Sequence, residues 1–309
     1  NFLLGDIETI ELNGGIGPVS LVVDTRGNIF SGMRTGDIVR IPKYRGLAKI
    51  ITNTGGVPMG VALTKDNSLV VCDAKIGLLQ VDLDGKISRL LTQINGEKIN
   101  NATGISVADS GEIYFSISSN KHSPNKAPYA ALEHSSKGSI GVYNPSDKTS
   151  KIIKSGLYFP TGIALSPNNE FILVAETWKY RILKIWLTGD MVGKAETFLD
   201  NLSGFPTGIS VDKNQRIWVA LTNRRSKLLD SLLEQHFWRR VLYRLPQFLL
   251  PSVTSSSIIL GVNLNGKITH RFLDDNNINF SPVTSIKEYS GSLFLGNASK
   301  TWIRRLQVL

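Results

Sequence analysis

Short runs of alternating hydrophobic and polar residues recur along the whole chain, and most are bounded by glycine, asparagine, aspartate or serine. A period of two predicts β-strands, and two such runs joined by a polar turn predict a β-hairpin. One hairpin pattern returns six times: a small or proline-containing turn, an apolar run, a polar turn and a second apolar run. The copies begin at Pro18, Pro58, Ala102, Pro160, Pro206 and Pro282.

Most copies are followed by a second hairpin, as in residues 77–90. Six units of four strands predict an all-β chain that folds as a six-bladed β-propeller, with residues 1–309 as a single domain. The steps between copies are 40, 44, 58, 46 and 76 residues, whereas a blade needs about 40–45. The two longest steps therefore predict insertions at about 118–137 and 222–255. An early strand, Ile7 to Glu11, is expected to pair with the last blade and hide its edge.

The second insertion carries a helical pattern, because leucines and aromatic residues recur at helical spacing between residues 228 and 245. We therefore expect a helical insertion in the fifth blade. Residues 224–251 contain six basic and two acidic side chains. A basic amphipathic helix is typical of a segment that lies on an anionic membrane surface. The candidate membrane contacts are Trp238, Arg239, Arg240 and Arg244. The alternative is a helix that packs its apolar face on the propeller.

The net charge of +10 favours anionic partners, but we expect no nucleic-acid partner. Cys72 is the only cysteine, which excludes an intrachain disulfide, and its apolar run predicts a buried thiol. No run reaches the roughly 18 apolar residues of a membrane span, and no signal-peptide pattern is present. The chain starts at Asn1, so an N-terminal anchor could have been removed. We expect a membrane-associated or a secretory or periplasmic protein.

Residues 171–177 (FILVAET), 181–189 (RILKIWLTG), 111–115 (GEIYF) and 291–296 (GSLFLG) resemble the strictosidine synthase-like family. The resemblance extends over nearly the whole chain. The insertion at 227–251 is similar to that of membrane-associated members of the adipocyte plasma membrane-associated protein type. The wider superfamily contains calcium-dependent lactonases and arylesterases of the gluconolactonase and paraoxonase type. The resemblance implies a six-bladed propeller with a ligand site in its central funnel, and it does not by itself give an activity.

The residue after each turn proline, or its equivalent, is expected to face the propeller axis. These six residues are Val19, Met59, Thr103, Thr161, Thr207 and Val283. The resemblance implies that metal-dependent relatives carry Glu at position 19, Asn at positions 103 and 161, and Asp or Asn at 207 or 208. Ca²⁺ needs six to eight oxygen ligands, including carboxylates. Three uncharged hydroxyls do not meet that need, so we predict a site without metal and without any other cofactor.

The same resemblance places a paraoxonase-type histidine at Met59 and the catalytic glutamate of strictosidine synthase at Thr284. Threonine cannot act as an acid or base near neutral pH, so no catalytic residue is assigned. Thr284 joins the six axis residues as a candidate ligand-binding residue of the funnel. Our leading hypothesis is a metal-independent propeller that binds or converts a small organic molecule in its funnel; if it is an enzyme, we expect a lyase or a hydrolase. One alternative is a calcium-dependent lactonase or arylesterase. Another is a non-catalytic scaffold whose threonines only support the strands around a water-filled channel.

Overall fold

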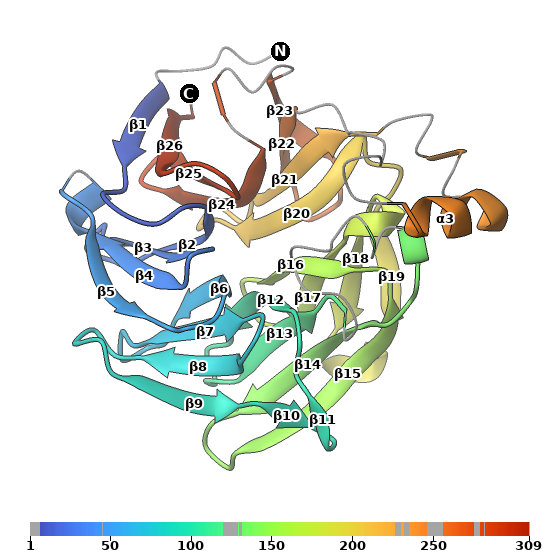
Figure 1. The fold of residues 1–309 in the computed structure, drawn as a ribbon, viewed down its shortest axis with the longest axis horizontal. Helices are drawn as coiled ribbons and strands as arrows, with labels where there is room; N and C mark the ends of the chain where they lie inside the picture. The colour runs from blue at the N-terminus through green and yellow to red at the C-terminus, as the bar shows by residue number, and fades with distance from the viewer. Residues whose placement is uncertain are drawn as a thin grey trace.

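Six four-stranded antiparallel sheets surround a central axis in the computed structural model, which confirms the six-bladed β-propeller (Figure 1). The structure describes residues 7–44, 46–119, 129, 132–225, 230–231, 235–245, 256–274, 279–280 and 282–308, with only the backbone of 44 and 236–238. Each of the first five blades runs outward from the axis in chain order. The predicted starts of the repeat therefore coincide with the innermost strands.

Within each blade the first-named strand lies nearest the axis and the last-named strand lies at the periphery. Blade 1 consists of β2 (Pro18–Val23), β3 (Ile29–Met33), β4 (Asp37–Ile41) and β5 (Lys49–Asn53). Blade 2 consists of β6 (Pro58–Leu63), β7 (Leu69–Asp73), β8 (Gly77–Val81) and β9 (Ile87–Leu91). Blades 3 and 4 consist of β12 (Ala102–Val107), β13 (Ile113–Ile117), β14 (Gly138–Asn144), β15 (Thr149–Leu157) and of β16 (Pro160–Leu165), β17 (Phe171–Glu176), β18 (Arg181–Trp186), β19 (Ala195–Leu199). Blades 5 and 6 consist of β20 (Gly204–Val211), β21 (Ile217–Arg224), β22 (Ser257–Val262), β23 (Ile268–Asp274) and of β24 (Val283–Tyr289), β25 (Ser292–Asn297), β26 (Trp302–Gln307), β1 (Ile7–Glu11).

The smaller elements lie between these strands. They are the short hairpin β10 (Gln93–Ile94) and β11 (Glu97–Lys98), the 3₁₀ turns η1 (Pro42–Tyr44), η3 (Thr177–Lys179) and η4 (Gly189–Met191), and the helix α3 (His236–Tyr243).

The ring closes where the first strand joins the last blade, as the sequence predicts. Strand β1 pairs antiparallel with β26, and Ile7 lies opposite Leu306. An ion pair of 3.0 Å between Arg305 and Glu8 spans the same two strands. Residues from the two ends of the chain thus form one sheet, which removes two exposed sheet edges.

Among the described residues, the hydrophobic core is divided into six clusters, and each lies between two neighbouring blades. Trp218 of blade 5, for example, packs with Val283 and Ile286 of blade 6. Phe115 of blade 3 packs with Cys72 of blade 2. Because every cluster belongs to two blades, no blade has a complete core of its own, and the blades stabilise one another.

Every innermost strand carries a register irregularity at the same point of the repeat. The shifts lie between Pro18 and Ser20, Pro58 and Gly60, Ala102 and Ile105, Pro160 and Ile163, Pro206 and Ile209, and Val283 and Ser285. A bulge inserts an unpaired residue and turns it away from the regular alternation. The structure therefore repeats one device six times around the axis.

Described residues of the two insertions contact each other. The Tyr129 hydroxyl donates to the main-chain oxygen of Leu245 at 3.1 Å, and the rings of Tyr129 and Tyr243 lie 5.7 Å apart. Tyr243 of helix α3, which lies at the edge of the molecule in Figure 1, therefore contacts Tyr129 of the other insertion. It has eight residues, and the remainder of the helical segment expected at 222–255 lies largely outside the described residues.

Candidate functional site

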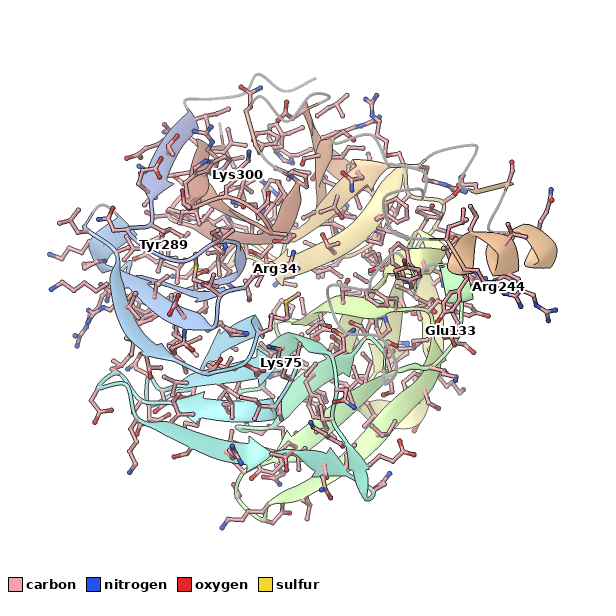
Figure 2. All side chains as sticks on the ribbon, in the orientation of Figure 1. Arg34, Lys75, Glu133, Arg244, Tyr289 and Lys300 are labelled. Atoms are coloured by element: carbon pink, nitrogen blue, oxygen red, sulfur yellow. The ribbon has the colours of Figure 1, made fainter. Side chains whose placement is uncertain are left out.

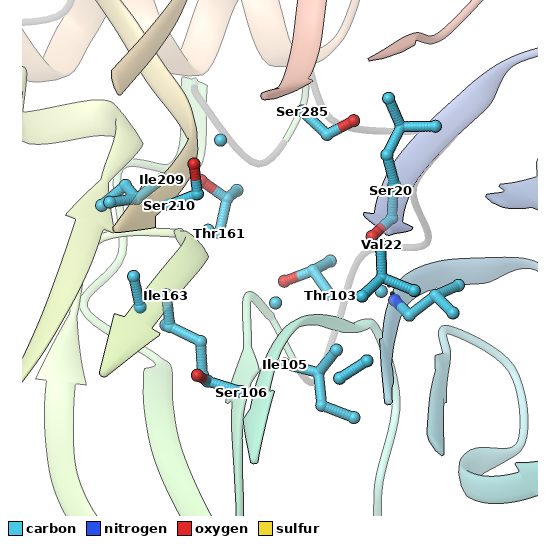
Figure 3. Close-up of a pocket in the computed structure, with 18 of the residues that line it drawn as sticks. Ser20, Val22, Thr103, Ile105, Ser106, Thr161, Ile163, Ile209, Ser210 and Ser285 are labelled. Carbon is cyan, nitrogen blue, oxygen red and sulfur yellow. Dashed lines mark hydrogen bonds between the residues drawn. The ribbon is translucent and has the colours of Figure 1, made fainter. Parts of the chain in front are cut away.

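A cavity of about 470 Å³ lies on the propeller axis and is lined mainly by the six innermost strands. Figure 3 shows side chains from several blades, among them Thr103, Thr161, Ser210 and Ser285, around one open space. The volume is in the range of pockets that hold small organic molecules. Strand register divides much of the lining into rings of six residues, one from each blade.

The first ring is formed by the bulge residues. Its members are Val19, Met59, Thr103, Thr161, Thr207 and Thr284, and all six line the cavity. Five of them are the axis-facing residues expected from the repeat. The sixth is Thr284, which the sequence placed in the funnel only as the equivalent of a catalytic glutamate, instead of Val283. Val283 occupies the place that proline holds in blades 1, 2, 4 and 5, and its side chain is buried among Trp218 and Ile286. The reason is the bulge, which in blade 6 falls one residue later after Pro282.

The threonine hydroxyls of this ring bind the neighbouring blades. Oxygen Oγ1 of Thr161 lies 3.2 Å from the main-chain oxygen of Thr207, and Oγ1 of Thr207 lies 3.2 Å from that of Val283. Oxygen Oγ1 of Thr103 lies 3.4 Å from the oxygen of Pro160 and 2.7 Å from Oγ of Ser118. Each hydroxyl thus has a protein acceptor in the following blade, which reduces what it offers to a ligand.

Small residues on the second strand continue this pattern. The Ser116 hydroxyl donates to the oxygen of Thr161 at 2.6 Å, and the Cys72 thiol lies 3.5 Å from the oxygen of Gly104. A Cβ atom added to Gly104 would lie 2.1 Å from the oxygen of Thr161. Gly104, which follows the bulge residue Thr103, is therefore required by the close approach of the next blade.

Apolar side chains form the middle of the cavity wall. One ring consists of Leu21, Val61, Ile105, Ile163, Ile209 and Ile286, and a further set consists of Val23, Leu63, Val107, Leu165 and Val211. Between these two sets lies a ring whose members are small, except for Lys287. The ring consists of Val22, Ala62, Ser106, Ala164, Ser210 and Lys287. Such a wall favours a ligand with an apolar body.

Lys287 is the site residue that the sequence reasoning missed. It is the only ionisable residue among those that line the cavity in the described part of the chain. Burial lowers the pKa of the Lys287 ammonium, while Glu288 and Asp212 act in the opposite direction. A signal was present in the repeat, because the equivalent residues of the other five blades are all uncharged.

The lining residues do not fit a Ca²⁺ ion. The described lining contains no carboxylate, its one charge is positive, and its threonine hydroxyls already have main-chain acceptors. Two nearby buried acids have other partners. Asp73 accepts from the Thr54 hydroxyl at 2.8 Å and from the Lys75 amide at 2.9 Å. Glu176 accepts from the Tyr158 amide at 2.7 Å and pairs with Arg181 at 2.5 Å. We therefore derive no chemistry through a metal.

The residues expected at a membrane surface lie far from this cavity. Arg240 and Arg244 of the α3 segment are exposed, and Figure 2 shows Arg244 at the rim of the molecule. Arg239 is 9% exposed, so it is not available as a surface contact. The side chain of Trp238 lies outside the described residues. Across the described chain, no helix has the length and apolar character needed to cross a bilayer.

The fold and the axial cavity define a six-bladed β-propeller with a mainly apolar central pocket. Two family models match the sequence, strictosidine synthase over residues 103–190 and strictosidine synthase-like, N-terminal, over residues 1–41. The adipocyte plasma membrane-associated protein of Rattus norvegicus is 30% identical over 82% of this chain and 71% of its own length. The chain therefore belongs to the strictosidine synthase-like family.

One further relative agrees with this assignment, and a solved structure agrees with the fold. Protein STRICTOSIDINE SYNTHASE-LIKE 6 of Arabidopsis thaliana is 27% identical over 92% of this chain and 76% of its own length. A solved gluconolactonase of Xanthomonas campestris superposes with a TM-score of 0.71 at 14% identity, over 99% of this chain and 91% of the other. At that identity the structural match supports the fold alone.

Proposed function

We propose that this propeller binds or converts a small organic molecule in its axial cavity without a metal ion. The observation that carries the proposal is the cavity of about 470 Å³, whose wall is mainly apolar and whose single charged residue is a lysine. Apolar area gives affinity, and a few polar groups give orientation. The structural neighbours named as a gluconolactonase and as regucalcin, a calcium-binding protein, share the fold. The lining residues of this chain favour a different chemistry from calcium-dependent hydrolysis.

The test is a thermal-shift screen of lactones, aryl esters, amines, aldehydes and carboxylates, repeated on a variant with a blocked cavity. Met59→Trp suits this purpose, because Met59 lines the cavity as a half-buried member of the bulge ring. Replacing it enlarges a side chain in the cavity and leaves the threonine hydroxyls in place. Ligands of the cavity should stabilise the wild type and not the variant. Equal stabilisation of both proteins would favour the scaffold hypothesis, which the engaged threonine hydroxyls support.

A calcium titration tests the metal-free part of the proposal. After treatment with a chelator, calorimetry should show no stoichiometric site of submillimolar affinity, since the cavity lacks the carboxylates that Ca²⁺ requires. Such a site, if it disappeared in Met59→Trp, would contradict the proposal and restore the calcium-dependent alternative.

We also propose that the α3 segment contacts an anionic membrane surface. Two observations support this proposal: Arg240 and Arg244 are exposed at the rim, and relatives carry the name adipocyte plasma membrane-associated protein. The cavity and the α3 segment consist of different residues, so a test of one proposal does not decide the other.

A further inference from the structure

Lys287 lines the cavity and lies in β24, the innermost strand of blade 6. It pairs with Phe294 of β25, three residues after the bulge residue Thr284. Its equivalents in the other blades are Val22, Ala62, Ser106, Ala164 and Ser210 by the register of the inner hairpins. A long basic side chain therefore stands in a ring whose other members are small and neutral.

No carboxylate of the described residues lies within ion-pair distance of the Lys287 ammonium. The two acids that attract it from farther away are held by other donors. The Glu288 carboxylate accepts from the Gly291 amide at 2.8 Å. Asp212 accepts from the Arg216 amide at 2.8 Å and from the Trp218 indole at 3.1 Å. The positive charge is consequently not balanced by a direct partner in the described wall.

An uncompensated ammonium in apolar surroundings is costly, and a bound anion removes part of that cost. The lowered pKa of Lys287 has burial as its largest cause, which agrees with this environment. A single lysine, with no arginine beside it in the lining, matches a monoanion better than a phosphate with two charges.

A second unused donor lies at the equivalent position of the adjacent inner strand. Ser210 of β20 is 7% exposed, lines the cavity, and its hydroxyl has no hydrogen-bond partner in the described structure. Strands β20 and β24 lie side by side, because a Cβ on Gly208 would come within 2.8 Å of the Cα of Ser285. Ser210 lies two residues after Gly208, and Lys287 lies two residues after Ser285, so the two residues occupy equivalent positions on neighbouring strands. A buried hydroxyl without an acceptor calls for an explanation, and a bound group that accepts from it is one.

We propose that the cavity accepts an amphipathic organic monocarboxylate, with the carboxylate paired to Lys287, a hydrogen bond from Ser210, and the apolar body along the ring of Ile105, Ile163 and Ile209. The inference rests on the proposed function, since it names the class of molecule that the same cavity takes. It assigns binding and orientation, and no chemical step.

The experiment compares octanoate with 1-octanol, an uncharged molecule of the same chain length, by calorimetry on the full chain. Wild-type protein should bind octanoate about 10- to 100-fold more tightly than 1-octanol, as expected for one hydrogen bond to a charged group. Lys287→Met should remove that preference while 1-octanol still binds. Lys287→Arg, which keeps the charge, should retain the preference, and Ser210→Ala should weaken octanoate binding by about 3- to 10-fold. Circular dichroism checks that each variant is folded.

Three results would overturn the inference: no octanoate binding to the wild type, equal affinity for the two probes, or unchanged octanoate affinity in Lys287→Met. These failures are distinct from failure of the proposed function. If one of these three results is obtained but neutral ligands bind the wild type and not Met59→Trp, the cavity remains a ligand site and only the carboxylate class is wrong. If ligands bind Met59→Trp as they bind the wild type, the cavity itself is not the site.

Discussion

The side-chain hydroxyl of Thr284, in the last blade, donates to the main-chain oxygen of Val19, in the first blade, at 3.1 Å. The two residues are 265 positions apart, and their contact joins the ends of the ring at the axis. The pairing of β1 with β26 joins them at the periphery. Thr161 and Thr207 make the equivalent inner contact between consecutive blades. The ring is therefore closed twice, once by backbone pairing and once by a side chain.

The inner closure predicts a measurable loss of stability in Thr284→Val. Valine keeps the shape of threonine but cannot donate to Val19, and a neutral hydrogen bond contributes about 0.5–1.5 kcal/mol. Urea unfolding should show a free energy of unfolding lower by that amount, whereas Thr284→Ser should stay closer to the wild type. If valine and serine behave alike, the hydroxyl contributes nothing to closure.

The close approach of neighbouring blades predicts that Gly104→Ala is more destabilising than Gly111→Ala. At Gly104 the added Cβ would lie 2.1 Å from the oxygen of Thr161, so two blades must separate. We expect about 3 kcal/mol, the upper part of the range for overpacking. Gly111 has a φ of +94° and open space, so alanine there costs only the backbone penalty of about 1–2 kcal/mol. Denaturant midpoints at equal m-values compare the two, and the reverse order would contradict the contact.

Stability should decrease at acidic pH through His270. Burial, followed by Arg216, lowers the pKa of His270 below 6.5, and Asp212 opposes them. The unfolded chain then takes up a proton at a higher pH than the folded chain, so the contribution of this group to stability is constant above pH 6.5 and is lost as pH falls below it. His270→Gln should reduce the difference between unfolding free energies measured at about pH 5.5 and about pH 8. The same difference in wild type and variant would show that other groups cause the pH dependence.

Cys72 should react with thiol reagents only when the blades open. Its side chain is fully buried, and burial, with a contribution from Asp73, raises the pKa of the thiol well above its usual range. A disulfide reagent should therefore label the native protein slowly, and urea should accelerate labelling in parallel with unfolding. Ser110→Cys, at an exposed turn, provides a fast-reacting control. Rapid labelling of Cys72 in the native state would contradict the tight contact between blades 2 and 3.

The repeat was readable from the sequence because it depends on local patterns. The starts of the inner strands at Pro18, Pro58 and Pro160, and the pairing of β1 with the last blade, follow from period-two runs and turn residues. The sequence repeat did not predict that Thr284, and not Val283, is the bulge residue of blade 6. The cause is the position of a bulge after Pro282, and a bulge adds one residue without leaving a distinct composition.

The roles of polar side chains near the axis were also beyond local patterns. Thr161 and Thr207 carry hydroxyls of the expected type, but their acceptors lie in the next blade. Lys287 looks like any polar residue of an alternating strand. Whether such a residue faces solvent, a neighbouring blade or the channel depends on packing across blades. Comparing equivalent positions of all six repeats would have identified it as the one charged member of its ring.

The exposed arginines of the α3 segment predict binding to an anionic membrane surface. Arg240 and Arg244 are exposed, whereas Arg239 is buried, so only the first two should contact lipid headgroups. Each basic residue near an anionic surface contributes roughly 1 kcal/mol. The double variant Arg240→Glu and Arg244→Glu should therefore lose most of its binding to vesicles that contain phosphatidylserine, as measured by sedimentation.

The matched control is Lys49→Glu with Lys86→Glu, two lysines of blades 1 and 2. Wild type and control should bind anionic vesicles more strongly than neutral ones and release them as salt increases. Equal binding by all three proteins would favour a helix that only packs on the propeller.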